Sequence, residues 1–291
     1  MLSILIPAYN YDITPLVQVL HSQCLAANIV FEIVVTDDSP GSASSIKNQS
    51  ITVLPHCCFF QNDTNLGRTL TRKKLSETAR YTTLLFLDAD VLPAESDFIK
   101  RYLPYINKEN VVVMGGYAYK PEEGQPILRL KYGLSREQKS AAERSKNPFT
   151  SVFSGNFLTS KQTFLLNNYP EDNNLYGMDN YFSYSLYKNG VEVIHIDNPI
   201  IHLGLEEDNV FFAKCLESVR VRKVLLADKT GVEAINPLLR YYKKLGKLQL
   251  RGFVAFSFRL AEPFLKKRIL SKDPNLFCLD LYRLGYICTL K

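Results

Sequence analysis

One run of apolar residues, 84–87, limits the folds open to this chain more than any other feature. Four consecutive apolar residues between polar ones are typical of a strand buried on both faces, as in a parallel sheet covered by helices. The run ends in Asp88-Ala89-Asp90. Because side chains alternate along a strand, Asp88 and Asp90 are expected to point the same way if the extended backbone continues. We therefore expect an α/β protein with two carboxylates at the end of a buried strand.

This pair of carboxylates has two interpretations. Two like charges so close together repel each other unless a cation lies between them. Mg²⁺ and Mn²⁺ take oxygen ligands and often join a carboxylate to the phosphates of a nucleotide. Open α/β sheets also bind their ligands at the carboxyl ends of the strands. In the second interpretation, Asp-x-Asp simply ends the strand in a turn.

The N-terminal third repeats the same pattern of strand and helix. Residues 3–10 are predicted to form a short strand that stops at Pro7, because proline cannot donate to a sheet ladder. A helix is expected over 16–25, strands over 31–35 and 57–61, and a basic helix over 69–80. Strands and helices alternating with short links predict a parallel sheet flanked by helices. Polar residues follow three of these strands: Tyr9 and Asn10, Asp37 and Asp38, Asp88 and Asp90.

Four segments in this order resemble the motifs of family 2 glycosyltransferases with the GT-A fold. They are Ile4-Leu5-Ile6-Pro7-Ala8-Tyr9-Asn10, Glu32-Ile33-Val34-Val35-Thr36-Asp37-Asp38-Ser39, Asn65-Leu66-Gly67 with Arg72, and Asp88-Ala89-Asp90. The resemblance covers roughly residues 2–210. It implies a Rossmann-like, mostly parallel sheet and an inverting transfer from a nucleotide-sugar, usually a UDP-sugar, helped by Mn²⁺ or Mg²⁺.

The resemblance also assigns residues to the nucleoside. Pro7, Ala8 and Tyr9 would line the uridine pocket. Asp38, or else Asp37, would meet the uracil or the ribose.

Three further residues would meet the phosphates and the metal. Arg72 would face the donor phosphates, Asp88 would lie near the ribose and the metal, and Asp90 would ligate the metal. Lys73 and Leu75 depart from the usual Asn and Gly of the family, which makes the transferred sugar harder to predict.

The acceptor hydroxyl needs a general base, and a carboxylate is the usual choice. The segment 176–181 resembles the Gly-Glu-Asp segment of the family and makes Asp179 the candidate base, although Met178 replaces the common glutamate. The alternative is that Asp179 only caps the helix that follows.

Two histidines follow or lie in apolar runs. In related enzymes a histidine at the place of His202 completes the metal shell, and imidazole suits Mn²⁺ better than Mg²⁺. A structural role for His202 stays open, and His195 is predicted to be structural. The charged stretch 135–147 is predicted to be a solvated helix, with a lid over the donor as the alternative.

The cysteines and the N-terminal residues indicate the cellular compartment of the protein. Six scattered cysteines without a metal-binding or disulfide spacing fit a reducing cytosol. Met1 leads directly into a predicted strand, so no signal peptide or N-terminal anchor is expected. We therefore expect a cytoplasmic protein.

The C-terminal tail is basic. Residues 235–291 carry twelve Lys or Arg against three Asp or Glu, a net charge of +9 in a chain of +6. A basic, aromatic-rich amphipathic segment suits an anionic membrane surface on the inner face of the cytoplasmic membrane. The alternative is a helical tail that packs on the catalytic domain. Nucleic acid is not expected as a partner, because no nucleic-acid-binding motif accompanies the charge.

Together these features predict a metal-dependent hexosyl- or N-acetylhexosaminyltransferase of polysaccharide biosynthesis, with a saccharide or lipid-linked glycan as acceptor. Residues 1–115 would bind the nucleotide-sugar, 116–210 the acceptor, and 211–291 would form the basic helical extension. A catalytically silent nucleotide-sugar-binding subunit is the alternative. A nucleotidyltransferase and a dinucleotide oxidoreductase are disfavoured, because no glycine-rich phosphate loop follows the first strand.

Overall fold

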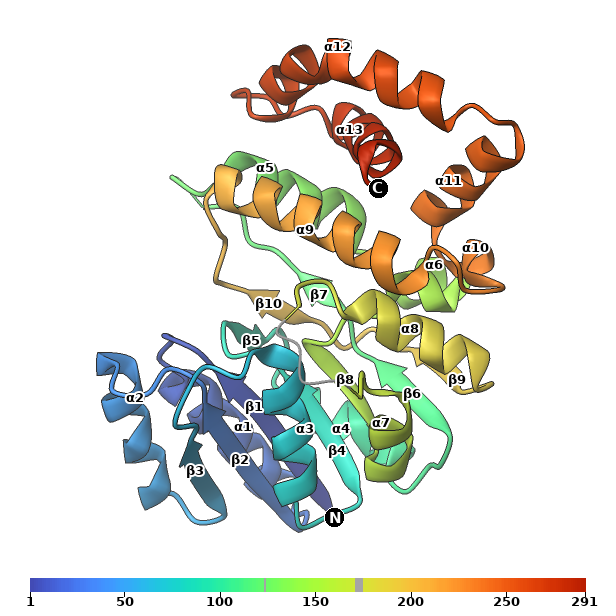
Figure 1. Ribbon diagram of the computed structural model, residues 1–291. Helices are drawn as coiled ribbons and strands as arrows, with labels where there is room; N and C mark the ends of the chain where they lie inside the picture. Colours follow the sequence, from blue (N-terminus) through green and yellow to red (C-terminus); the bar gives the residue numbers. More distant parts are fainter. Residues whose placement is uncertain (123, 171–174) are drawn as a thin grey trace.

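The computed structural model describes residues 1–122, 124–170 and 175–291, and its centre is a seven-stranded sheet (Figure 1). Residues 123 and 171–174, within the predicted acceptor half, lie outside the described residues. All strands of this sheet run parallel except β8, which is antiparallel to both of its neighbours. In spatial order the strands are β3 (Cys57–Gln61), β2 (Phe31–Asp37), β1 (Leu2–Ala8), β4 (Thr83–Leu87), β8 (Asn156–Ser160), β6 (Val111–Met114) and β9 (Glu192–His195).

The predicted strands are confirmed, and alternation along them builds two cores. Ile4 and Ile6 of β1 join one buried cluster, while Leu5 between them joins the cluster on the opposite face. The prediction that this strand stops at Pro7 is wrong, because β1 continues to Ala8. Its neighbour β4 pairs only with residues 3–5, so Pro7 removes no ladder bond on that side.

Helices cover both faces of the sheet (Figure 1). Phe98 and Tyr102 of α4 pack with α1 in one core, and Leu75, Phe164 and Phe182 of α3, α7 and α8 pack in the other. The helices of this part are α1 (Thr14–Ala26), α2 (Ala43–Asn48), α3 (Arg68–Thr78), α4 (Phe98–Tyr102), α5 (Ile127–Tyr132), α6 (Ala141–Ser145), α7 (Lys161–Asn167) and α8 (Asp179–Lys188).

A small sheet beyond the end of β4 brings distant residues together. Its three strands are, in spatial order, β5 (Val91–Pro93), β10 (Ile200–His202) and β7 (Tyr117–Ala118). His202 pairs with Val91 in the antiparallel register, and the Leu203 amide donates to the Asp90 carbonyl at 2.8 Å. This pairing places Asp90 beside a histidine more than one hundred residues further along the chain.

The C-terminal residues form a helical extension, as predicted, which stacks beyond the end of the sheet (Figure 1). Its helices are α9 (Asp208–Leu226), α10 (Val232–Ile235), α11 (Pro237–Lys247), α12 (Arg251–Ile269) and α13 (Leu276–Thr289). Phe258 of α12 packs edge-on against Tyr282 of α13 at 4.9 Å between ring centroids. Gly285 permits this contact, since a Cβ there would lie 2.3 Å from the Phe258 ring.

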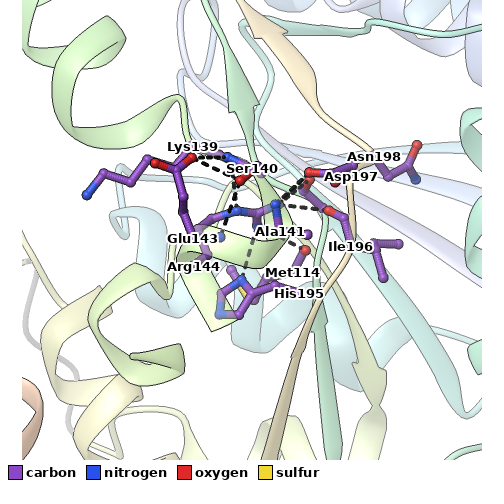
Figure 2. A network of polar contacts seen from close by, with 12 residues as sticks. Met114, Lys139, Ser140, Ala141, Glu143, Arg144, His195, Ile196, Asp197 and Asn198 are labelled. Atoms are coloured by element: carbon purple, nitrogen blue, oxygen red, sulfur yellow. Dashed lines mark hydrogen bonds and ion pairs between the residues drawn. The ribbon is translucent and has the colours of Figure 1, made fainter. Parts of the chain in front are cut away.

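The prediction of a solvated helix over 135–147 is wrong at Arg144, which is only 2% exposed (Figure 2). Its guanidinium donates to the carbonyls of Met114, Gly115 and Ile196 at 2.8–3.2 Å and so fastens the short α6 to the sheet. The sequence around Arg144 is charged and gives no sign of this burial, because the carbonyls that accept from Arg144 belong to distant segments of the chain.

His195 has the structural role that was predicted. Arg144 Nη1 lies 3.1 Å from His195 Nδ1 (Figure 2). On the other side of the ring, His195 Nε2 lies 3.0 Å from the Pro148 carbonyl. Burial, with Arg144 beside it, lowers the pKa of His195 to about 4. The ring is therefore neutral at physiological pH, donates from Nε2 and accepts at Nδ1.

Arg144→Ala is expected to lower the free energy of unfolding by about 3 kcal/mol, because three carbonyls each lose one donor and a buried side chain is removed. Urea unfolding followed by circular dichroism measures this loss. Lys146→Ala, at an exposed position two residues away, is the matched control and should change stability by no more than about 0.5 kcal/mol. Equal stabilities of the two variants would contradict the assigned role.

Candidate active site

A cavity of about 1400 Å³ opens at the carboxyl ends of the parallel strands and extends under the helices of the C-terminal part. Eight of the ten predicted site residues line it: Pro7, Ala8, Tyr9, Asp38, Arg72, Asp88, Asp90 and Asp179. The other two do not line it: Asp37 is fully buried, and His202 lies 3.6 Å from the cavity residue Asp90. The fold therefore brings residues from five separate segments to one place.

Asp88 is held by two arginines at the floor of this cavity. Its Oδ1 accepts from Arg72 Nη2 at 2.6 Å, and both side chains are largely buried. Burial by itself raises the pKa of Asp88, but Arg72 and Arg68 outweigh burial and lower it overall. The carboxylate is therefore ionised at neutral pH.

Asp90 has the opposite electrostatic balance. Burial raises the pKa of Asp90, the negative charge of Asp88 adds to this rise, and His202 opposes it. The His202 Nε2 lies 3.6 Å from Asp90 Oδ2, and the imidazole stacks on Tyr119 at 5.8 Å between centroids. Space beside Asp90 is tight, since a Cβ on Gly204 would lie 2.3 Å from its Oδ2.

Asp90 and His202 fit a divalent cation that arrives with its substrate. In the described part of the chain, no three His, Cys, Asp or Glu residues form a group that could hold a metal alone. An oxygen and an imidazole nitrogen are donors that suit Mn²⁺. Small hard cations commonly take one or two protein ligands and complete their shell from phosphates and water. The pair would therefore hold a metal only together with a phosphate-bearing ligand.

Asp179 faces the same cavity from the start of α8. The N-cap residue of this helix is Met178, and no side chain makes a hydrogen bond at that cap. The Asp179 carboxylate instead hydrogen-bonds Ser154, so the capping interpretation is not supported. Burial raises the pKa of Asp179, Arg72 partly opposes this rise, and Asp88 adds to it. A buried carboxylate with a raised pKa is suited to accept a proton.

The paired aspartates at the end of β2 are engaged by the protein itself. Asp37 Oδ1 accepts from the amide and the hydroxyl of Ser39, at 2.7 and 2.5 Å. Asp38 accepts from the amides of Leu66 and Gly67 at 2.8 and 2.7 Å. Both carboxylates therefore shape the loops around the cavity, and of the two only Asp38 reaches its wall.

Arg68 is a cavity residue that the sequence reasoning did not select. It begins α3 directly after Gly67, whose φ of +80° favours glycine. The pKa of Arg68 is raised, first by Asp88 and also by Asp90 and Asp179, so its guanidinium lies among the three acidic groups of the site. Its spacing of four residues from Arg72 on a predicted helix could have indicated one shared face.

The comparison with protein families decides the identity of the chain. The model of glycosyl transferase family 2 matches residues 3–165. The chain belongs to this family. The predicted fold class, a Rossmann-like GT-A sheet with a helical C-terminal region, is confirmed, and glycosyl transfer is the general activity of the family. No curated protein matches the sequence of this glycosyltransferase.

Solved structures share the fold of this glycosyltransferase at low identity. PcManGT, a mannosyltransferase from Pyrobaculum calidifontis in complex with GDP-Man and Mn²⁺, has a TM-score of 0.61 and 12% identity, over 98% of this chain and 85% of that chain. TarS from S. aureus has a TM-score of 0.52 and 16% identity, over 80% of this chain. The match covers only 41% of the TarS chain.

Proposed function

We propose that the protein is an inverting glycosyltransferase that moves a hexose or N-acetylhexosamine from a nucleotide-sugar, with UDP as the expected nucleotide. The observation that carries this proposal is the cavity that Asp88, Asp90 and Asp179 line together. The structures of TarS with UDP-GlcNAc and of PcManGT with GDP-Man support a nucleotide-sugar donor.

The donor would bind along the ends of the parallel strands. Pro7, Ala8 and Tyr9 would surround the nucleoside, while Asp37 and Asp38 would shape its loops. Asp88 would lie near the ribose. Half-exposed Tyr9 offers an aromatic face at the cavity wall.

The residues around the acidic cluster supply the chemistry. The Asp179 carboxylate would take the proton of the acceptor hydroxyl as the oxygen attacks the anomeric carbon and the bond to the nucleoside diphosphate breaks. Arg68 and Arg72 would stabilise the negative charge that develops on the departing diphosphate. A bound Mn²⁺ or Mg²⁺, held by Asp90 and His202, would supply further positive charge there.

The proposed division of labour follows the predicted boundaries. Residues 1–115 would bind the donor, 116–210 would hold the acceptor together with Asp179, and 211–291 would form the helical extension. A saccharide or lipid-linked glycan in polysaccharide assembly is the proposed acceptor.

Calorimetric titration with UDP, GDP and dTDP, each with and without Mn²⁺, tests the donor proposal. We expect UDP to bind most tightly and only UDP binding to rise strongly with Mn²⁺. Preference for another nucleotide would change the donor, whereas no binding by any of the three would contradict the proposal. Retained UDP binding without any transfer would favour the alternative of a silent subunit, which is suggested by Met178 in place of glutamate.

We further propose that the outer face of α12 contacts the anionic inner leaflet of the cytoplasmic membrane. Four large apolar side chains, at spacings of three, four and four residues, are 60–72% exposed there: Phe253, Phe256, Leu260 and Phe264. The exposed Arg259, Lys266 and Lys267 lie on the same helix and match the charge of acidic lipids. None of the described helices has the length and apolar character needed to cross a bilayer.

Sedimentation with lipid vesicles tests this face. Binding to vesicles containing phosphatidylglycerol is expected, with weak binding to pure phosphatidylcholine. The double variant Phe256→Ser with Leu260→Ser should bind at least about tenfold more weakly, because two apolar side chains no longer enter the interface. Val224→Ser removes a side chain that is 79% exposed on α9 and should bind like the wild type. Equal binding of all three proteins would contradict the proposal.

A further inference from the structure

A second charged region of the cavity lies away from the acidic cluster, between α9 and α13. Arg222 of α9 and Arg283 of α13 both line the cavity there. Arg222 is 8% exposed, and the Arg283 side chain is 14% exposed. Neither residue takes part in the donor chemistry described above. Two nearly buried guanidinium groups therefore need an explanation of their own.

The hydrogen bonds of these two arginines are made to neutral groups. Among the residues that the structure describes, Arg222 donates to its helix neighbour Ser218, to the carbonyl at 3.2 Å and to the hydroxyl at 3.0 Å. Arg283 hydrogen-bonds Tyr132, and its Nε is buried without a partner among the residues that the structure describes. Ser218 and Tyr132 are neutral, so these hydrogen bonds do not cancel either charge.

One carboxylate is shared by this region. Asp280 Oδ1 lies 3.8 Å from Arg283 Nη1, which is a long ion pair, and Asp280 Oδ2 accepts from Arg136 at 2.6 Å. Among the other acidic side chains of this part of the cavity, Glu137 pairs with Arg129 and Glu206 with Lys214, whereas Glu217 accepts from the neutral Tyr176 amide and keeps its charge. Arg222 and the four basic side chains named here outnumber the four acidic ones by one. An excess of positive charge therefore remains.

The electrostatic consequence is visible at Arg222. Burial and the neighbouring Arg283 lower the pKa of Arg222 to about 9, which still leaves the guanidinium charged at neutral pH. Buried like charges are costly unless an opposite charge lies with them. Guanidinium groups also bind phosphate and carboxylate through paired N–H donors. The arrangement is thus prepared for an anion that enters from the cavity.

We propose that Arg222 and Arg283 bind an oxyanion of the acceptor, a phosphate or a carboxylate, while its hydroxyl lies toward Asp179. This inference rests on the proposed transferase function. Two apolar side chains at the rim of the same cavity are exposed, Phe277 by 68% and Leu281 by 42%. An acceptor that joins its charged group to an apolar chain would use both surfaces.

Titration with three probes tests the proposal on the full chain, with UDP present in excess so that the donor site is filled. The probes are inorganic phosphate, glucuronate and farnesyl phosphate. Farnesyl phosphate is expected to bind more tightly than inorganic phosphate if the apolar rim takes part. Tighter binding of glucuronate would assign the same arginines to an acidic saccharide.

Arg222→Gln and Arg283→Gln should each lower the affinity for the tightest-binding probe at least about tenfold, because a charge-assisted hydrogen bond is lost. Arg222→Lys keeps the charge but not the paired donors, so its affinity for the probe should lie between those of the wild type and Arg222→Gln. Arg240→Gln, at an exposed position on α11, is the matched control and should bind the probe like the wild type. Thermal unfolding gives an independent readout, since removal of an uncompensated buried charge should leave stability unchanged or higher.

The outcomes separate this proposal from that of the donor site. Unchanged UDP affinity in the variants together with weakened probe binding supports the acceptor subsite. Binding of UDP without binding of any probe, or equal probe binding by the variants and the wild type, overturns it. Loss of stability in both Gln variants with no change in probe affinity would assign the arginines to the fold and likewise overturn it. Absence of UDP binding in every protein would instead count against the donor proposal.

Discussion

Asp179→Asn should reduce the rate of glycosyl transfer by roughly 10²- to 10⁴-fold while leaving UDP binding intact, since the amide cannot accept the acceptor proton. The structure supports this expectation because the carboxylate faces the cavity and hydrogen-bonds Ser154 instead of capping α8. Release of UDP from a panel of UDP-sugars, with candidate acceptors present, measures the rate. Calorimetry with UDP measures binding separately.

The pH dependence of transfer gives a second readout for the same residue. Burial raises the pKa of Asp179 above the ordinary value of an aspartate, so the carboxyl gains its proton at a higher pH than an exposed aspartate would. Only the ionised form can act as a base, so the rate should fall as pH decreases through this raised pKa. The acidic limb should disappear from any residual activity of Asp179→Asn.

A matched control distinguishes the role of Asp179 from a general effect of charge. Glu233→Gln removes an exposed carboxylate from the first turn of α10, where it pairs with Lys243 at 2.9 Å, and should leave the rate unchanged. A normal rate in Asp179→Asn would exclude Asp179 as the base. Loss of UDP binding together with activity would mean that the substitution had disturbed the donor site.

Asp90→Ala should weaken Mn²⁺-dependent UDP binding by about a hundredfold or more, because loss of even an outer partner of a metal ligand commonly costs 10- to 100-fold. UDP binding without metal should change little or become tighter, since a negative charge next to the diphosphate is removed. Calorimetric titration measures the affinity for UDP with and without Mn²⁺. The difference between them isolates the contribution of the metal.

Two companion variants sharpen the test of Asp90. Gly204→Ala keeps the carboxylate but places a Cβ 2.3 Å from its Oδ2, so the same loss is expected from displacement alone. Asp228→Ala removes an exposed carboxylate from the end of α9 and should bind UDP and Mn²⁺ normally. If Asp90→Ala retains the full effect of Mn²⁺, the metal is held elsewhere.

The sequence by itself determined the sheet and the edge at which the site lies. The apolar run 84–87 predicts a strand buried on both faces, and the structure buries all of β4. The polar residues after the strands predict a shared site, and Asp38, Asp88 and Asp90 all reach the cavity. These inferences succeed because alternation and burial are local properties, which a pattern of neighbouring residues records directly.

Only the tertiary structure decided which charged groups meet. Arg144 lies in a segment that reads as solvated, yet its donors meet carbonyls on β6 and after β9. Arg222 and Arg283 are 61 positions apart and meet through the packing of α9 against α13. The reason is physical: the partners and the burial of a charge depend on three-dimensional packing between distant segments, and no local pattern of residues encodes that distance.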